Sequence, residues 1–238
     1  LFLTTFSVYQ SQWVSFFIFL SLCSMFVGNL MALTQKNIKR MLAYSSIAHT
    51  GYIFIGFAVA KSLSLSAMLF YVIVYVLANI GAFAVVIANS QRGKGESIES
   101  FAGLGQTMPY LSLAMTIFLL SLAGIPPLAG FMGKLNLFLA AVIGGYTWLV
   151  LIAVLNSAVS LYYYLGVVRQ MYLPGLTLSQ EFGLNPIQTR SEEPSGFRGN
   201  SKLLHVAITI LVIAIISIGI YPTPFIRLAQ TAINTFFF

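Results

Sequence analysis

Hydrophobic residues in this chain gather into six long runs that are separated by short polar stretches. Each run holds about 20 apolar residues, the number a helix needs to cross about 30 Å of hydrocarbon. None of them shows the two-residue alternation that is typical of barrel strands. The pattern predicts an all-α membrane protein with six transmembrane helices, at residues 12–33, 40–60, 64–89, 108–140, 145–171 and 203–221.

The composition agrees with lipid surroundings. Of the 238 residues, 58% are hydrophobic and 7% are charged, whereas a soluble domain has about a quarter charged residues. The one cysteine, Cys23, lies inside the first run, which excludes a disulfide framework, a zinc site or an iron–sulfur site. The chain starts at Leu1 without a charged segment and cleavage site, so we expect no signal peptide, and we interpret this start as a fragment or an internal start.

Lys and Arg residues mark one side of the membrane. Nine follow the first, third and fifth runs, whereas only Lys61 and Arg227 lie on the opposite side. By the positive-inside rule, the nine face the cytoplasm or its equivalent, the matrix or stroma. The net charge of +7 is therefore interpreted as a topology signal and not as a nucleic-acid surface.

Three parts follow from these patterns. Residues 1–173 are expected to form a five-helix unit, and the polar stretch 174–201 a loop on the inner face. Residues 202–238 are expected to hold the final transmembrane helix, a break at Tyr221-Pro222-Thr223-Pro224, and a short amphipathic helix at the outer interface.

One charged residue, Lys134, falls inside a hydrophobic run. As a single straight helix that run would be about 50 Å long, and Pro126 and Pro127 within it lack an N–H. We therefore predict a discontinuous helix, broken near Gly124–Pro127, with halves near 108–123 and 127–141. Placing a Lys at this depth costs at least about 2.5–3.5 kcal/mol on insertion scales. Burial disfavours the ammonium form, so Lys134 can exchange protons more easily, as a proton relay requires. The alternative is a Lys that extends to the outer face.

Polar side chains form stripes on three of the predicted helices. At four-residue spacing the third helix carries Tyr71, Tyr75 and Asn79, and the fifth carries Asn156, Ser160 and Tyr164; the second carries Ser45, Ser46, His49 and Tyr52. His titrates near neutrality, which makes His49 the strongest candidate among them. The alternative for each of these residues is ordinary interhelical packing, worth about 0.6 kcal/mol per contact.

Two segments resemble a known family. The segment GNLMALTQKNIKRMLAYSSIAHTGY at 28–52 resembles the signature of the antiporter-like subunits of respiratory complex I. The segment SLAGIPPLAGFMGK at 121–134 is similar to their discontinuous twelfth helix, which carries a pumping lysine. The Tyr-rich run 161–165 favours the group called subunit N, or subunit 2, or B in the photosynthetic version. Asn79 favours it too, because the M and L subunits and sodium/proton antiporters carry a Lys there.

The resemblance implies a fold and a site. The family has fourteen helices with two inverted five-helix repeats, and the six helices here match the second repeat and the final helix. The first repeat, with its glutamate and lysine, is missing, so we expect an incomplete sequence or a split gene. Lys134 would carry protons in an outward half-channel. The residues that would hold water around it are His49, Tyr71, Tyr75, Asn79, Ser45 and Tyr164.

The resemblance also implies a function. We expect a proton-translocating subunit of NADH (or ferredoxin):quinone oxidoreductase, in a bacterial inner, thylakoid or mitochondrial inner membrane. The expected partners are subunits M, K and J, the lateral helix of L, lipid and the missing repeat, with no nucleic acid. This chain would hold no cofactor or metal, since flavin, iron–sulfur clusters and quinone belong to other subunits. The alternatives are a sodium/proton antiporter subunit, against which Asn79 argues, and a structural spacer.

Overall fold

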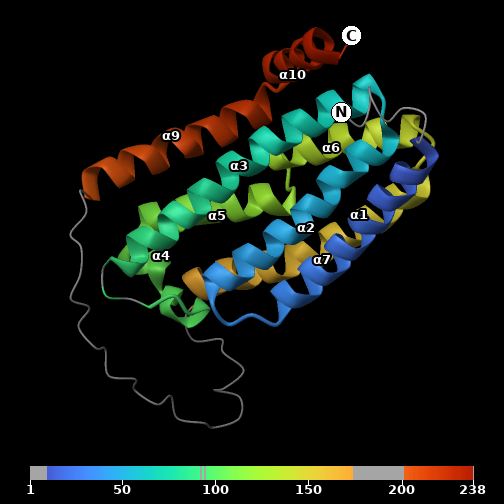
Figure 1. Cartoon of the computed structure of the whole chain (residues 1–238). Coiled ribbons are helices and arrows are strands. Elements are labelled where there is room, and N and C mark those ends of the chain that lie inside the picture. Colours follow the sequence, from blue (N-terminus) through green and yellow to red (C-terminus); the bar gives the residue numbers. More distant parts are fainter. Residues whose placement is uncertain (1–9, 92, 94, 174–200, 238) are drawn as a thin grey trace.

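The structure, a computed structural model, describes residues 10–91, 93, 95–173 and 201–237. Within these ranges the regular elements are helical, and the only β pairing is an isolated bridge between Asn37 and Ser97. The predicted all-α class is confirmed. The elements are α1 (Gln10–Leu33), α2 (Ile38–Val59), α3 (Ser62–Ser90), η2 (Ile98–Phe101), α4 (Leu104–Thr107), α5 (Pro109–Ala123), α6 (Ala129–Ile143), α7 (Thr147–Tyr172), α9 (Ser201–Ile220) and α10 (Thr223–Phe237) (Figure 1).

Five of these helices, α1, α2, α3, α7 and α9, are long and apolar enough to cross a membrane. The helices α5 and α6 have 15 residues each, too few to cross alone. They follow one another along the bundle and together form the fourth predicted segment (Figure 1). The six predicted crossings therefore correspond to five continuous helices and one broken one.

The break begins where α5 ends. Gly124 takes a left-handed conformation, with φ of 88°, which a residue without Cβ adopts at little cost. The N–H groups of Gly124 and Ile125 both donate to the carbonyl of Leu120, at 3.0 Å, and close the last turn of α5. The Pro126–Pro127 bond is cis, and α6 starts at Ala129. The predicted discontinuity is therefore confirmed.

The final long helix covers this break. Helix α9 packs against α3, α5 and α6. Gly219 allows the contact, because a Cβ at that position would overlap the carbonyl oxygen of Pro127. Interrupted backbone at membrane depth is tolerated only where protein or a cavity faces it, and α9 supplies that protein here.

Hydrogen bonds join the turns at the predicted inner end. Asn37 caps α2, and its Oδ1 atom accepts from the N–H groups of Lys39 at 2.9 Å and Arg40 at 3.2 Å. Ile38 donates its N–H to the carbonyl of Glu96 at 2.9 Å, and the side chains of Lys39 and Glu96 form an ion pair. The turn before α2 is therefore fixed to the segment after α3.

The predicted inner end of the bundle, where α1 leads into α2, also holds basic residues. The described basic residues from the predicted inner loops are Lys36, Lys39, Arg40, Arg169 and Lys202. Lys61 precedes α3 at the opposite end, where α10 also packs along α3 and Ser62 donates to Asn234 at 3.2 Å. Of the predicted loop 174–201, all but Ser201 lies outside the described residues.

Candidate functional site

The side chain of Lys134 lies in the second turn of α6 and points back toward the break. It is 5% exposed, and its Nζ atom donates to the carbonyl oxygen of Ala123 at 3.0 Å and to Oγ of Ser157 at 2.8 Å. A helical side chain is directed toward the N-terminus of its helix, which here leads away from the outer end. The geometry therefore differs from the alternative in which Lys134 extends to the outer face.

Breaking the helix supplies one of these acceptors. The last carbonyls of a helix have no partner within it, and they carry the negative end of the helix dipole. The Ala123 carbonyl is one of these groups, and it faces the ammonium of Lys134. The two carboxylates in the described part of the chain, Glu96 and Glu99, lie outside the membrane helices. Neutral dipoles therefore stabilise the charge of Lys134.

His49 joins two neighbouring helices to α2. Its Nδ1 atom lies 2.6 Å from the hydroxyl of Tyr71 on α3, and its Nε2 atom lies 3.2 Å from the hydroxyl of Tyr164 on α7. A neutral imidazole donates at one nitrogen and accepts at the other, so one tyrosine accepts from His49 and the other donates to it. The three side chains are buried, and the ring of Tyr75 lies 4.9 Å from that of His49.

The ring of Tyr52 connects this cluster to Lys134. Nζ of Lys134 lies 5.0 Å from the ring centroid of Tyr52, within the range of a cation–π contact. The rings of His49 and Tyr52 meet edge to face at 5.8 Å. The Tyr52 hydroxyl is buried near the side chain of Asn29, and no described residue forms a hydrogen bond of good geometry with it. Such a group is a candidate position for an internal water molecule.

The remaining predicted residues, Asn79 and Ser45, are not among the hydrogen-bond partners of Lys134. Asn79 donates to the hydroxyl of Tyr75 at 3.3 Å, and its Oδ1 atom is buried without a partner in the described part of the chain. Ser45 is buried one turn before His49, and its hydroxyl donates to the carbonyl of Leu42 in its own helix. The structure therefore brings His49, Tyr71, Tyr75 and Tyr164 together, whereas Asn79 reaches this group only through Tyr75.

Two contacts were not predicted from the sequence. Ser157, an acceptor for Lys134, lies next to the predicted stripe on α7 and not in it. Asn29 of α1 donates to Oδ1 of Asn156 at 3.3 Å and accepts from the hydroxyl of Tyr163 at 3.1 Å, which ties α1 to α7. The freed carbonyls were implied by the Gly-Ile-Pro-Pro segment, but nothing in the sequence distinguishes Ser157 from its neighbours.

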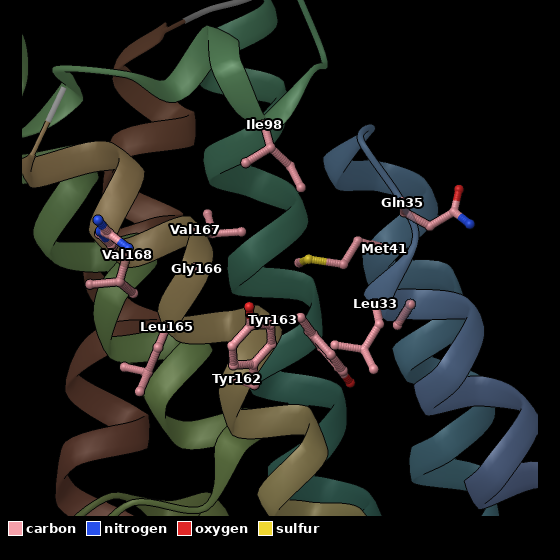
Figure 2. Close-up of a pocket in the computed structure, with 12 residues that line it drawn as sticks. Leu33, Gln35, Met41, Ile98, Tyr162, Tyr163, Leu165, Gly166, Val167 and Val168 are labelled. Atoms are coloured by element: carbon pink, nitrogen blue, oxygen red, sulfur yellow. The ribbon is translucent and has the colours of Figure 1, made fainter. Parts of the chain in front are cut away.

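A cavity of about 390 Å³ adjoins Lys134. Lys134 and Ser157 line it together with Gly124 and apolar side chains of α5, α6 and α7. A larger cavity of about 620 Å³ lies toward the inner end, between α7 and the α1–α2 turn (Figure 2). Met41 points toward it, whereas the amide of Gln35 is turned away and donates to the carbonyl of Met31. None of the predicted site residues lines the larger cavity, so the candidate site is the one at Lys134.

The described residues contain no group of three His, Cys, Asp or Glu side chains that would hold a metal ion. Outside the membrane helices, the hydrogen bond from Lys39 is the main cause that lowers the pKa of Glu96. The chemistry available at the buried site is therefore that of one amine, one imidazole and several hydroxyl groups.

Comparison with known proteins places the chain in a family. The family described as NADH:quinone oxidoreductase/Mrp antiporter, TM, matches residues 1–160. The chain is 46% identical over 214 residues to NADH-quinone oxidoreductase subunit N 1 of Thermodesulfovibrio yellowstonii, covering 90% of this chain and 42% of that protein. The resemblance found in the two motifs is therefore confirmed.

Solved structures agree with this result. One is respiratory complex I from Thermus thermophilus with bound aureothin, where a chain is 34% identical, with a TM-score of 0.71, and covers 90% of this chain and 45% of its own length. A chain of the Mrp complex from Dietzia has a TM-score of 0.77 at 20% identity, covers 98% of this chain and 49% of its own, and shows the fold alone. The chain spans less than half the length of each protein that it matches here.

Proposed function

The chain belongs to the NADH:quinone oxidoreductase/Mrp antiporter membrane family, and we propose that it carries protons as part of the membrane arm of an NADH (or ferredoxin):quinone oxidoreductase. It is a multi-pass integral protein of an energy-transducing membrane. The observation that carries the proposal is a buried Lys134 whose two hydrogen-bond acceptors among the described residues are both neutral. An amine in that position exchanges its proton more readily than one held by a carboxylate.

In this mechanism the proton is held at Nζ of Lys134. The protonated amine is stabilised by the carbonyl of Ala123, the hydroxyl of Ser157 and the face of the Tyr52 ring. When charge or hydration changes along the membrane arm, this balance shifts and the proton is released into the outward half-channel. The same acceptors stabilise the ammonium more than the neutral amine. They therefore favour re-protonation of Lys134 after the proton has left.

The cluster around His49 supports proton movement near Lys134. Imidazole and hydroxyl groups each both donate and accept hydrogen bonds, so the chain Tyr71–His49–Tyr164 has the elements of a relay. Water at the unpaired hydroxyl of Tyr52 would connect this chain to the amine. Tyr75, Asn79 and Ser45 would hold further water along the same faces of α3 and α2.

The redox step would take place elsewhere in the complex. Flavin, iron–sulfur clusters and quinone would be held by other subunits, and this chain would couple their reaction to proton transfer. The proposed neighbours are subunits M, K and J, the lateral helix of L, lipid and the first repeat of the fold.

The test is Lys134→Ala in the assembled complex, in inverted membrane vesicles supplied with NADH or reduced ferredoxin. Proton pumping, measured by quenching of a pH-sensitive dye, is expected to fall about tenfold or more, since a positioned proton-transfer group typically contributes about 10² or more to a rate. Lys61→Ala, at the exposed start of α3, is the control and should pump normally. Near-normal pumping by an assembled Lys134→Ala complex would remove Lys134 from the mechanism. Sodium-driven proton exchange without an electron donor would favour the antiporter alternative.

A further inference from the structure

We propose that Ser157 is a positioning residue that holds Lys134 in its protonated form. The inference rests on the proposed function, and it concerns the neighbour of the amine on α7. The hydroxyl of Ser157 accepts from Nζ of Lys134 at 2.8 Å, the shorter of the two hydrogen bonds that the amine makes.

Three helices meet at this point. The Oγ atom of Ser157 also donates to the carbonyl oxygen of Ala123, at 3.3 Å, and Lys134 donates to the same carbonyl at 3.0 Å. A serine hydroxyl has one donor and two acceptor positions, so it can accept from the amine and donate to the carbonyl at the same time. The three groups therefore close a triangle between the end of α5, the second turn of α6 and the middle of α7.

This triangle discriminates between the two forms of the amine. Hydrogen bonds from an ionised donor are roughly twice as strong as those between neutral groups. Both acceptors face Nζ with their negative ends, so the arrangement favours the ammonium over the neutral amine. Because neither acceptor is charged, they stabilise the ammonium less than an ion pair would. The proton can therefore still leave Lys134.

The neighbouring serine shows that the arrangement is specific to Ser157. Ser160 is buried one turn further along α7, but its hydroxyl donates to the backbone carbonyl of Ser157 at 2.7 Å. Ser157 and Lys134 also line the same cavity of about 390 Å³, which leaves room for proton exchange beside them. The two serines thus offer a matched pair on one helix, with one touching the amine and the other not.

The experiment measures proton pumping against pH in the assembled complex for Ser157→Ala, Ser157→Thr and Ser160→Ala. Removing an acceptor destabilises the ammonium, so the alkaline pH at which pumping is half-maximal should fall by about one unit in Ser157→Ala, a tenfold change in proton affinity. Ser157→Thr keeps the hydroxyl and should retain the original profile. Ser160→Ala should also retain it.

Several results would overturn the inference. A Ser157→Ala profile that coincides with the original, a drop that is equal at every pH, or a shift that Ser160→Ala shares would each do so. If Ser157→Ala does not assemble, Ser157→Cys serves instead, since a thiol is a weak acceptor of similar size, and the same downward shift is expected. Loss of pumping in Lys134→Ala with an unshifted Ser157→Ala profile would reject this inference alone, whereas normal pumping in Lys134→Ala would reject the proposed function.

Discussion

The Nζ atom of Lys134 donates to the carbonyl oxygen of Ala123 at 3.0 Å, although eleven positions separate them in the chain. In an unbroken helix that carbonyl would accept from the N–H of residue 127, a position that proline occupies here. The interruption of the helix and the placement of the amine are therefore one feature. Substitutions that change the backbone of the link 124–128 should therefore reduce both proton transfer and the stability of the fold.

Gly124→Ala tests this connection. Forcing a residue with Cβ into φ of 88° costs about 1–2 kcal/mol, and the added atom would lie 3.0 Å from the Lys134 side chain. We expect a lower melting temperature of the solubilised complex and reduced pumping. Gly145→Ala is the control, because Gly145 has φ of 92° with open space around it. It should lose similar stability and pump normally; equal pumping defects in the two variants would contradict the connection.

His49→Phe tests the cluster beside the amine. It leaves the hydroxyls of Tyr71 and Tyr164 buried without this partner, and an unpaired buried group costs about 1–3 kcal/mol. We expect reduced thermal stability and reduced proton pumping, with partial recovery in His49→Gln, whose amide both donates and accepts. His205→Phe, which can keep a ring stacked on Tyr110, should change pumping little. Normal pumping by a His49→Phe complex would show that the cluster has only a structural role.

Glu96→Gln tests the inner-end contact. The lowered pKa of Glu96 means that its ion pair with Lys39 stabilises the fold above the ordinary carboxyl value of 4.5, and that this contribution is lost as pH falls through the depressed pKa. Both side chains are more than a third exposed, so we expect a loss of no more than about 1 kcal/mol near pH 7. Thermal melting at several pH values from 7 down to 3 measures it, and the difference from the unaltered complex should shrink as the pH falls below 4.5. A difference in melting temperature that does not shrink as the pH falls would show that the loss of stability has another cause.

The sequence predicted the parts of the fold that depend on local composition. Runs of apolar residues locate helices in lipid, and Gly124, Pro126 and Pro127 locate the break, because these residues change the backbone wherever they occur. The burial of Lys134 followed from its position inside such a run. These features need no knowledge of how the helices are arranged around one another.

The contacts of the site depend on that arrangement and could not be predicted. Adjacent residues of a helix point about 100° apart, so Asn156 faces Asn29 of α1 while Ser157 faces Lys134 of α6. A stripe at four-residue spacing identifies a polar face without identifying its neighbour. Asn79 shares a stripe with Tyr71, yet its hydrogen bond goes to Tyr75.

The packing of α9 over the break affects how the protein is made. The link 124–128 leaves the ribosome and reaches the membrane well before Gly219, which later rests against the carbonyl of Pro127. During that interval the interrupted backbone lacks its native cover, so nascent chains truncated before α9 should be preferred substrates for membrane quality-control proteases. Insertion of α9 is thus the step in synthesis that covers the interrupted backbone and protects the bundle from these proteases.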